Sequence, residues 1–171
     1  MPAVLNRRSS AEADVPPDPA LKLSDYLPYL INRVGSALAA QYTRDALAAH
    51  SLGIDMWRVL AVLSDNGGQR QIDLAGVTSI EASTVSRIVT RLVRLGLVTR
   101  SRSETSNREV LVQLTAKGRA LVRRLIPVAL RLEESALSGI APKDLALVKN
   151  ALRRIYGNLA QDRKQSVSRG R

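Results

Sequence analysis

Cysteine is absent from this chain of 171 residues, and His50 is its single histidine. Without thiols there is no disulfide framework, no thiolate metal site and no cysteine-based oxidation sensing. Zinc sites and hydrolytic triads both depend on histidine, and one imidazole does not supply either. The sequence also has no glycine-rich loop that could hold a phosphate. We therefore expect a protein that is not an enzyme and has no metal or cofactor.

Aromatic residues are equally scarce, at 3% of the chain with no phenylalanine. Single-stranded RNA is read by stacking bases on aromatic side chains, and none lies in the basic segment 87–124. No apolar run approaches the roughly 18 residues of a membrane span, and the basic segment lacks aromatic membrane anchors. The N-terminal residues lack the apolar core of a signal peptide. These absences favour double-stranded DNA over RNA or a membrane as the partner, and a cytoplasmic location.

Positive charge is abundant and concentrated. The formal net charge is +11 and the pI is near 11.0, while residues 87–124 hold ten Lys or Arg and only two acids, a net +8. Such a local excess is typical of a protein that binds a polyphosphate.

Residues 81–95, EASTVSRIVTRLVRL, predict an amphipathic helix. Its apolar residues follow a helical spacing that places them on one side: Val85, Ile88, Val89, Leu92 and Leu95. The opposite side carries hydroxyls and arginines, and the helix has no acid after Glu81. Such a helix can bury its back and lay its front against phosphates and base edges. A solvated basic face is the alternative.

The flanking segments complete a DNA-binding unit. Residues 71–78 predict a short helix and 79–80 a turn, which together with the basic helix form a helix-turn-helix. Residues 97–102 and 108–114 predict two strands, joined by the polar link 103–107. A helix-turn-helix followed directly by a basic hairpin is a winged helix-turn-helix.

Residues 71–118 resemble the MarR family of transcriptional regulators. The resemblance rests on IDLAGVTSIEASTVSRIVTRLVRLGLV and on VLVQLTAKG leading into a long helix, and extends more loosely over 24–161, including SLGIDMWRVLAVL. Three positions depart from the family pattern. Ser79 replaces the usual turn glycine, and Glu81 is a poorer N-cap than Ser or Asp. Thr90 replaces an aspartate that often pairs with the last wing arginine, so Arg108 would be held by a neutral hydrogen bond or left freer for phosphate.

The predicted fold is mainly α with a small β-hairpin wing, a winged helix-turn-helix plus a helical dimerisation region. Its predicted segments are a flexible N-terminal tail (1–20), the dimerisation region (21–54 and 120–161), the DNA-binding domain (55–119) and a basic C-terminal tail (162–171). In the helices Pro28 is tolerable in a first turn, whereas Pro127 should kink or break its helix. Asp55 and Thr115 are candidate N-caps.

The last helix predicts the mode of assembly. Beginning at Pro142, it has apolar residues at alternating three- and four-residue steps: Leu145, Val148, Leu152, Ile155 and Leu159. This seam fits another helix, within the chain or in a second copy. The family resemblance implies a homodimer, whose two-fold symmetry would place the recognition helices about 34 Å apart on a pseudo-palindromic site.

The predicted DNA-binding residues lie on the basic helix and the wing. Ser83, Thr84 and Ser86 can bind base edges or phosphates, and Arg87 can make a bidentate contact with guanine. The phosphate backbone would be held by the remaining cations: Arg91, Arg94, Arg100, Arg102 and Arg108. Any one of these arginines could instead be merely solvated.

A small-molecule effector is implied by the resemblance, because relatives often bind small anionic aromatic compounds between the dimer helices and the winged domain. The corresponding residues are Arg33, Ser36, His50, Trp57 and Arg58. Arginine beside an indole suits an aromatic carboxylate or an anionic thioester. Alternatively, Trp57 belongs to the core and the two arginines to surface ion pairs.

These features predict a dimeric, sequence-specific transcriptional regulator, a repressor released by its effector. The alternative is a DNA-packaging protein that tolerates any sequence and needs no effector.

Overall fold

The structure, a computed structural model, describes residues 20–102 and 110–169, without the side chains of 102 and 162–169. Residues 1–19 of the predicted N-terminal tail, the wing link 103–107 and Arg108 lie outside the described residues. The chain forms two compact units, Met1–Ala37 and Leu38–Arg171, whose boundary falls within the first helix.

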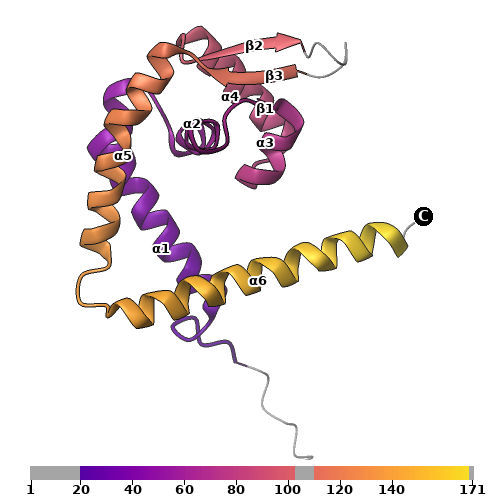
Figure 1. The fold of residues 1–171 in the computed structure, drawn as a ribbon. Helices are drawn as coiled ribbons and strands as arrows, with labels where there is room; N and C mark the ends of the chain where they lie inside the picture. Colours follow the sequence, from indigo (N-terminus) through magenta and orange to yellow (C-terminus); the bar gives the residue numbers. More distant parts are fainter. Residues whose placement is uncertain (1–19, 103–109, 170–171) are drawn as a thin grey trace, which may run out of the picture. The chain divides into compact units, whose positions relative to one another are not determined.

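The described elements are mostly helices (Figure 1). In chain order they are α1 (Leu27–Tyr42), the π-helical turn η1 (Thr43–Leu47), the 3-10 turn η2 (Ala48–His50), α2 (Ile54–Asn66), β1 (Gln69–Arg70), α3 (Gln71–Thr78), α4 (Ala82–Arg94), β2 (Val98–Arg102), β3 (Val110–Leu114), α5 (Ala116–Ala136) and α6 (Pro142–Arg169). The predicted helix-turn-helix and the two wing strands are confirmed, as is the mainly helical fold class with a small hairpin.

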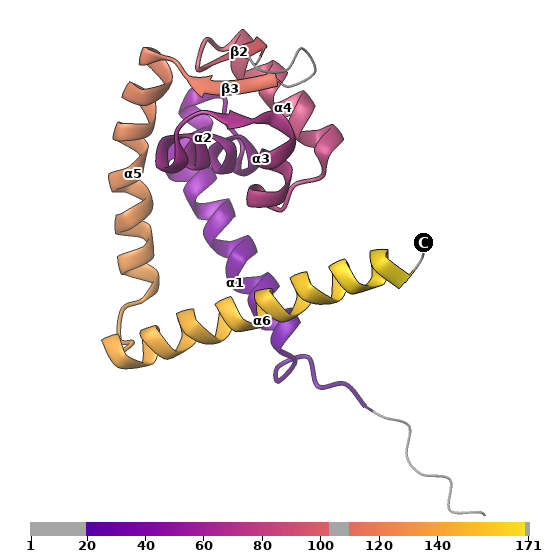
Figure 2. The same ribbon diagram turned by 45° about the vertical axis from the view of Figure 1, so that its right-hand side comes forward.

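The winged domain is built around α2, α3 and α4, which pack against one another and against the sheet (Figures 1 and 2). Its three antiparallel strands are ordered β1-β3-β2, with Val98 opposite Leu114 and Arg102 opposite Val110. The predicted apolar stripe of α4 is buried, since Val85, Val89 and Leu92 are 0% exposed. Burial of this stripe leaves the hydroxyl-and-arginine side of α4 at the surface.

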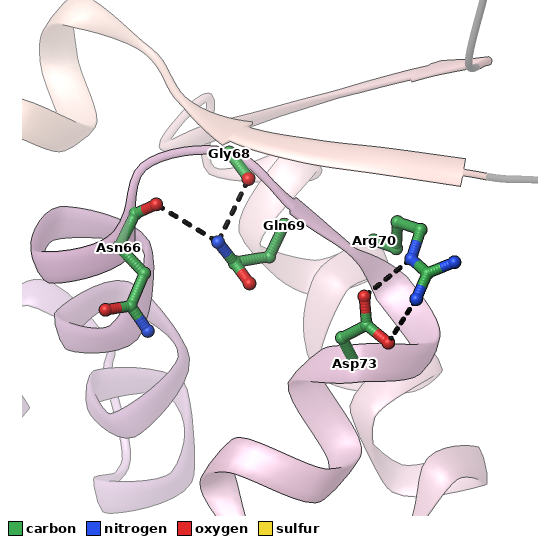
Figure 3. Close-up of polar contacts among 5 residues, drawn as sticks. All are labelled: Asn66, Gly68, Gln69, Arg70 and Asp73. Carbon is green, nitrogen blue, oxygen red and sulfur yellow. Dashed lines mark hydrogen bonds and ion pairs between the residues drawn. The ribbon is translucent and has the colours of Figure 1, made fainter. Parts of the chain in front are cut away.

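The short strand β1, which the sequence analysis did not predict, adds a third strand through Arg70 and Leu111. Figure 3 shows the contacts at this junction. The Arg70 guanidinium donates to Asp73 in the first turn of α3, with Nε to Oδ2 at 2.6 Å and Nη2 to Oδ1 at 2.9 Å. Gln69 Nε2 donates to the carbonyls of Asn66 and Gly68, both at 3.1 Å. These bonds tie the end of α2 to the start of α3.

The structure tests several local predictions. Helix α2 begins at Ile54, one residue before Asp55, and its N-cap is Gly53. Asp55 is therefore not an N-cap, and it pairs with Arg58 instead. Helix α5 continues through Pro127, so the predicted break does not occur, and the predicted kink stays a prediction. Helix α6 extends to Arg169, into the segment predicted as a C-terminal tail. Thr115 is an N-cap as predicted, accepting from the Gly118 amide at 2.9 Å.

Within the described residues, no single helix has the length and apolar composition of a membrane span. The segments Leu27–His50 and Ile54–Asn66 reach that length and composition only as a pair, and the pair is bent by 80°.

Candidate nucleic-acid interface

The turn before α4 is held in a left-handed conformation. Ser79 has φ of 55°, so serine occupies the backbone region that glycine would reach without strain. Ile80 is buried after it, and α4 then begins behind Glu81. The turn thus fixes where the recognition helix starts.

Glu81 caps α4 despite its low rank as an N-cap residue. Its carboxylate oxygen Oε2 accepts from the backbone amides of Ser83 at 3.0 Å and Thr84 at 3.2 Å, and also from the Ser83 hydroxyl. The Ser83 hydroxyl, followed by the two amides, lowers the pKa of Glu81 below its ordinary value, so the carboxylate is charged at neutral pH. Glutamate is a better cap here than its rank predicts, because its longer side chain folds back to accept from two amides and a hydroxyl.

The front of α4 is hollowed into a basic groove. This hollow, of about 390 Å³, is lined only by hydroxyl and arginine residues: Ser86, Arg87, Thr90, Arg91 and Arg94. Arg87 Nη2 donates to Thr84 Oγ1 at 3.0 Å, so the two predicted base-reading residues are in contact. Arg94, which the sequence placed among the phosphate-binding arginines and near the solvated end of the helix, also lines this groove.

The base of the wing is joined to the recognition helix by Thr90. Arg100 Nη2 donates to Thr90 Oγ1 at 3.2 Å, and Thr90 Oγ1 donates to the Ser86 carbonyl at 2.9 Å. The partner of Thr90 is therefore Arg100, at the start of the wing, whereas the sequence analysis considered Arg108. Because Thr90 is neutral, it does not offset the positive charge of Arg100 beside the groove. The side chain of Arg102 lies outside the described residues.

Some of the basic residues in 87–124 bind backbone carbonyls. Lys117 Nζ donates to Leu95 O at 2.9 Å, near the end of α4, and Arg119 Nη1 donates to Leu114 O at 2.7 Å. Arg91 Nη2 reaches the Ser51 carbonyl at 3.3 Å. Some cations of this segment therefore stabilise the fold through backbone carbonyls, and others are left at the surface. Composition alone does not distinguish these two groups.

The predicted effector residues fall into both units. In the first unit Ser36 is exposed and the Arg33 guanidinium lies 5.7 Å from the ring centroid of Tyr29. In the second unit His50 is exposed, and Trp57 meets Tyr42 edge to face with ring centroids 5.3 Å apart. Arg58 forms an exposed ion pair with Asp55 at 3.1 Å. Trp57 therefore packs against the core while Arg58 lies in a surface ion pair, which is the alternative that the sequence left open for these two residues.

A cleft of about 220 Å³ adjoins Tyr42, and the sequence analysis did not predict it. It is lined by both polar and apolar side chains: Gln41, Tyr42, Asp45, Val128, Arg131, Leu132 and Ser135. Tyr42 donates its hydroxyl to the Leu125 carbonyl at 2.9 Å, and burial raises its pKa to about 12, so this wall of the cleft is neutral. Arg131 supplies a cation at the same cleft.

Across the part of the chain that the structure describes, no group of three or more His, Asp or Glu side chains is arranged to hold a metal ion.

Known proteins resemble this chain over most of its length. The MarR family model matches residues 54–110. The HTH-type transcriptional repressor NicR of Pseudomonas putida is 28% identical over 138 residues, which are 77% of this chain and 87% of NicR. A solved MarR-family transcriptional regulator from Silicibacter pomeroyi is 31% identical with a TM-score of 0.72, over 80% of this chain and 92% of that one.

A further solved relative is BpsR of Bordetella bronchiseptica, described for the regulation of its DNA binding by 6-hydroxynicotinic acid. It is 27% identical with a TM-score of 0.73, over 81% of this chain and 98% of BpsR. The resemblance found in the sequence is thereby confirmed. With its helix-turn-helix, its three-stranded wing sheet and these relatives, the chain belongs to the MarR family of winged helix-turn-helix transcriptional regulators.

Proposed function

We propose that this protein is a sequence-specific repressor that binds double-stranded DNA through α4 and the wing. The observation that carries the proposal is the groove on α4, in which hydroxyls and arginines are the only lining residues. A recognition helix enters the major groove by its N-terminal part, where Ser83, Thr84, Ser86 and Arg87 lie. In this role Arg87 makes the bidentate contact with guanine.

The phosphate backbone is the partner of the other cations. Arg91 and Arg100 flank the α4 groove, while Arg102 and Arg108 continue along the wing sequence. Contacts of this kind fix the orientation of the protein on the duplex without reading its sequence.

The protein acts as a homodimer that binds a pseudo-palindromic site. Helix α1 exposes Leu27, Leu30, Ile31 and Val34, each between 39% and 60%, and α6 exposes Val148, Leu152 and Leu159 at 41–62%. Apolar faces of this length are rarely left in water by a monomer. A second copy would cover them, with residues 21–54 and 120–161 as the dimerisation region and 55–119 as the DNA-binding domain.

A small anionic aromatic acid or its thioester releases the protein from DNA. BpsR, whose DNA binding responds to 6-hydroxynicotinic acid, supports this class of effector. The proposed contacts are Arg33, Ser36, His50, Trp57 and Arg58, in which a guanidinium binds the carboxylate and the indole packs against the ring. Arg131, at the Tyr42 cleft, is a further candidate counter-charge.

The DNA-binding proposal is tested with the duplex upstream of the protein's own gene and a shuffled duplex of equal composition. At fixed salt, a specific regulator binds the first duplex about 10³-fold or more tightly. A ratio near one would instead support the packaging protein.

The effector proposal is tested by titrating aromatic acids and their thioesters into the protein–DNA complex. A ligand that weakens DNA binding about 100-fold must be bound about 100-fold more weakly by the DNA complex, because the coupling is reciprocal. Replacing Arg33, Arg58 or Arg131 with Ala should preserve DNA affinity and raise the concentration needed for release. If only Arg131→Ala has this effect, the effector occupies the Tyr42 cleft. If none has it, the pocket lies elsewhere.

A further inference from the structure

Glu81 carries a negative charge at the start of the helix that is proposed to meet DNA. It is the only acid between Asp73 and Glu104, and it stands at the start of α4, the end that enters the groove. A carboxylate at this position repels phosphates and so reduces the affinity of the helix for any duplex. Helix capping alone does not require this charge, because Ser, Thr and Asn cap helices well without it.

Only one oxygen of the Glu81 carboxylate, Oε2, accepts hydrogen bonds from the described residues. The amides of Ser83 and Thr84 and the hydroxyl of Ser83 all donate to Oε2. Among the described residues, nothing donates to Oε1. Three bonds thus fix the direction of the carboxylate and leave one charged acceptor oxygen for a group outside the chain.

Arg87 is positioned close to this acceptor. Its Nη2 donates to Thr84 Oγ1 at 3.0 Å, and Thr84 is itself bonded to Glu81 through its backbone amide. The charges of Glu81 and Arg87 also attract each other. The first turns of α4 therefore present both a charged acceptor and a guanidinium donor, and base edges can pair with both, whereas phosphates offer acceptors only.

We propose that Glu81 is a specificity-determining residue. Its charge repels the phosphates of every duplex, and only a sequence that offers Oε1 a base amino group, such as cytosine N4, offsets this repulsion with a hydrogen bond. The proposal rests on the proposed function, in which α4 reads double-stranded DNA. Specificity is a difference between two affinities, and an acid that weakens the wrong complex increases that difference as effectively as a new contact strengthens the right one.

The size of the effect follows from Coulomb's law. Two like unit charges about 4 Å apart in water repel each other enough to change an equilibrium constant by about fivefold. Removing the charge of Glu81 should therefore tighten binding to shuffled DNA by about that factor. Binding to the operator should not tighten, since the lost contact with the amino group offsets the lost repulsion.

The experiment measures affinities for operator and shuffled duplexes at one salt concentration, by fluorescence anisotropy. Glu81→Gln keeps an acceptor oxygen but loses the charge, and should lower the operator-to-shuffled ratio at least about fivefold. It should also relax the preference at one base pair in each half-site. Glu81→Ser, an uncharged residue that caps helices well, should lower the ratio in the same way. Glu81→Asp keeps both cap and charge but withdraws the carboxylate by one methylene, so it should bind shuffled DNA as weakly as the wild type does.

Glu134→Gln, an exposed substitution on α5, is the matched control, because it changes the net charge equally and should leave the ratio unchanged. The inference is overturned if the wild type prefers its operator about 10³-fold and both Glu81→Gln and Glu81→Ser retain that preference. It is also overturned if Glu134→Gln lowers the ratio as much as they do. A wild-type ratio near one overturns the proposed function itself.

Discussion

Gly118 allows the wing to join the following helix, and replacing it with alanine should destabilise the protein. Helix propensity alone favours the opposite result, since alanine is better than glycine inside a helix by about 1 kcal/mol. Gly118 is buried in the first turn of α5, where a Cβ would overlap the Leu97 carbonyl oxygen and lie 3.0 Å from its carbon. Backbone cannot move aside as a flexible side chain can, so either α5 or the start of β2 must shift.

The shift also disturbs the hydrogen bonds that close this junction. The Leu97 carbonyl accepts from the Thr115 amide at 3.0 Å and from the Thr115 hydroxyl at 3.2 Å. Overpacking costs about 1–3 kcal/mol, and a weakened hydrogen bond adds about 1 kcal/mol. After subtracting the gain in helix propensity, we expect Gly118→Ala to lower the free energy of unfolding by about 1–3 kcal/mol. In a protein of this size that corresponds to a fall in Tm of about 2–12 °C.

Thermal unfolding monitored by circular dichroism at matched protein concentration measures this effect. Gly76→Ala is the control, because Gly76 is also helical, in α3, and a Cβ there meets nothing within 4 Å. This control should keep or raise Tm, following helix propensity. A Gly118→Ala variant as stable as the wild type would refute the argument from the Leu97 carbonyl.

Three further outcomes are expected. Arg87→Ala should weaken operator binding by about 1–3 kcal/mol and relax one base preference per half-site. Arg102→Ala should instead weaken binding to all duplexes and reduce the slope of log affinity against log salt concentration by about 1, and indistinguishable effects of the two variants would contradict these roles. Replacing Leu152 and Ile155 together with Asp should give monomers or unfolded chain in sedimentation, and a wild type that is monomeric at micromolar concentration would contradict the dimer. Because the pKa of Glu81 is lowered by folding, its stabilising effect is present above the ordinary carboxyl value of 4.5 and is lost as pH falls through the lower folded pKa. Glu81→Gln should therefore flatten the acid limb of the stability curve, and an unchanged limb in acid titration would contradict the cap.

The sequence by itself determined the helix-turn-helix and the wing, because their signals are local. The spacing of Val85, Val89 and Leu92 defines the buried side of a helix from α4 alone, and these residues are all completely buried. The alternation of helix, turn, helix and hairpin is equally readable from neighbouring residues. Thr115 is recognisable as an N-cap because the amide that it caps is only three residues away.

Tertiary structure alone decided which partner each polar side chain would take. Strand β1 exists because Arg70 pairs with Leu111, a residue 41 positions further on, and no local pattern reveals so short a strand. The positions of Lys117 and Thr90 likewise depend on atoms brought from elsewhere in the chain, at Leu95 and Arg100. Hydrophobic periodicity is a property of one segment, whereas a hydrogen bond needs two groups within about 3 Å of each other, and the folded chain determines which groups meet.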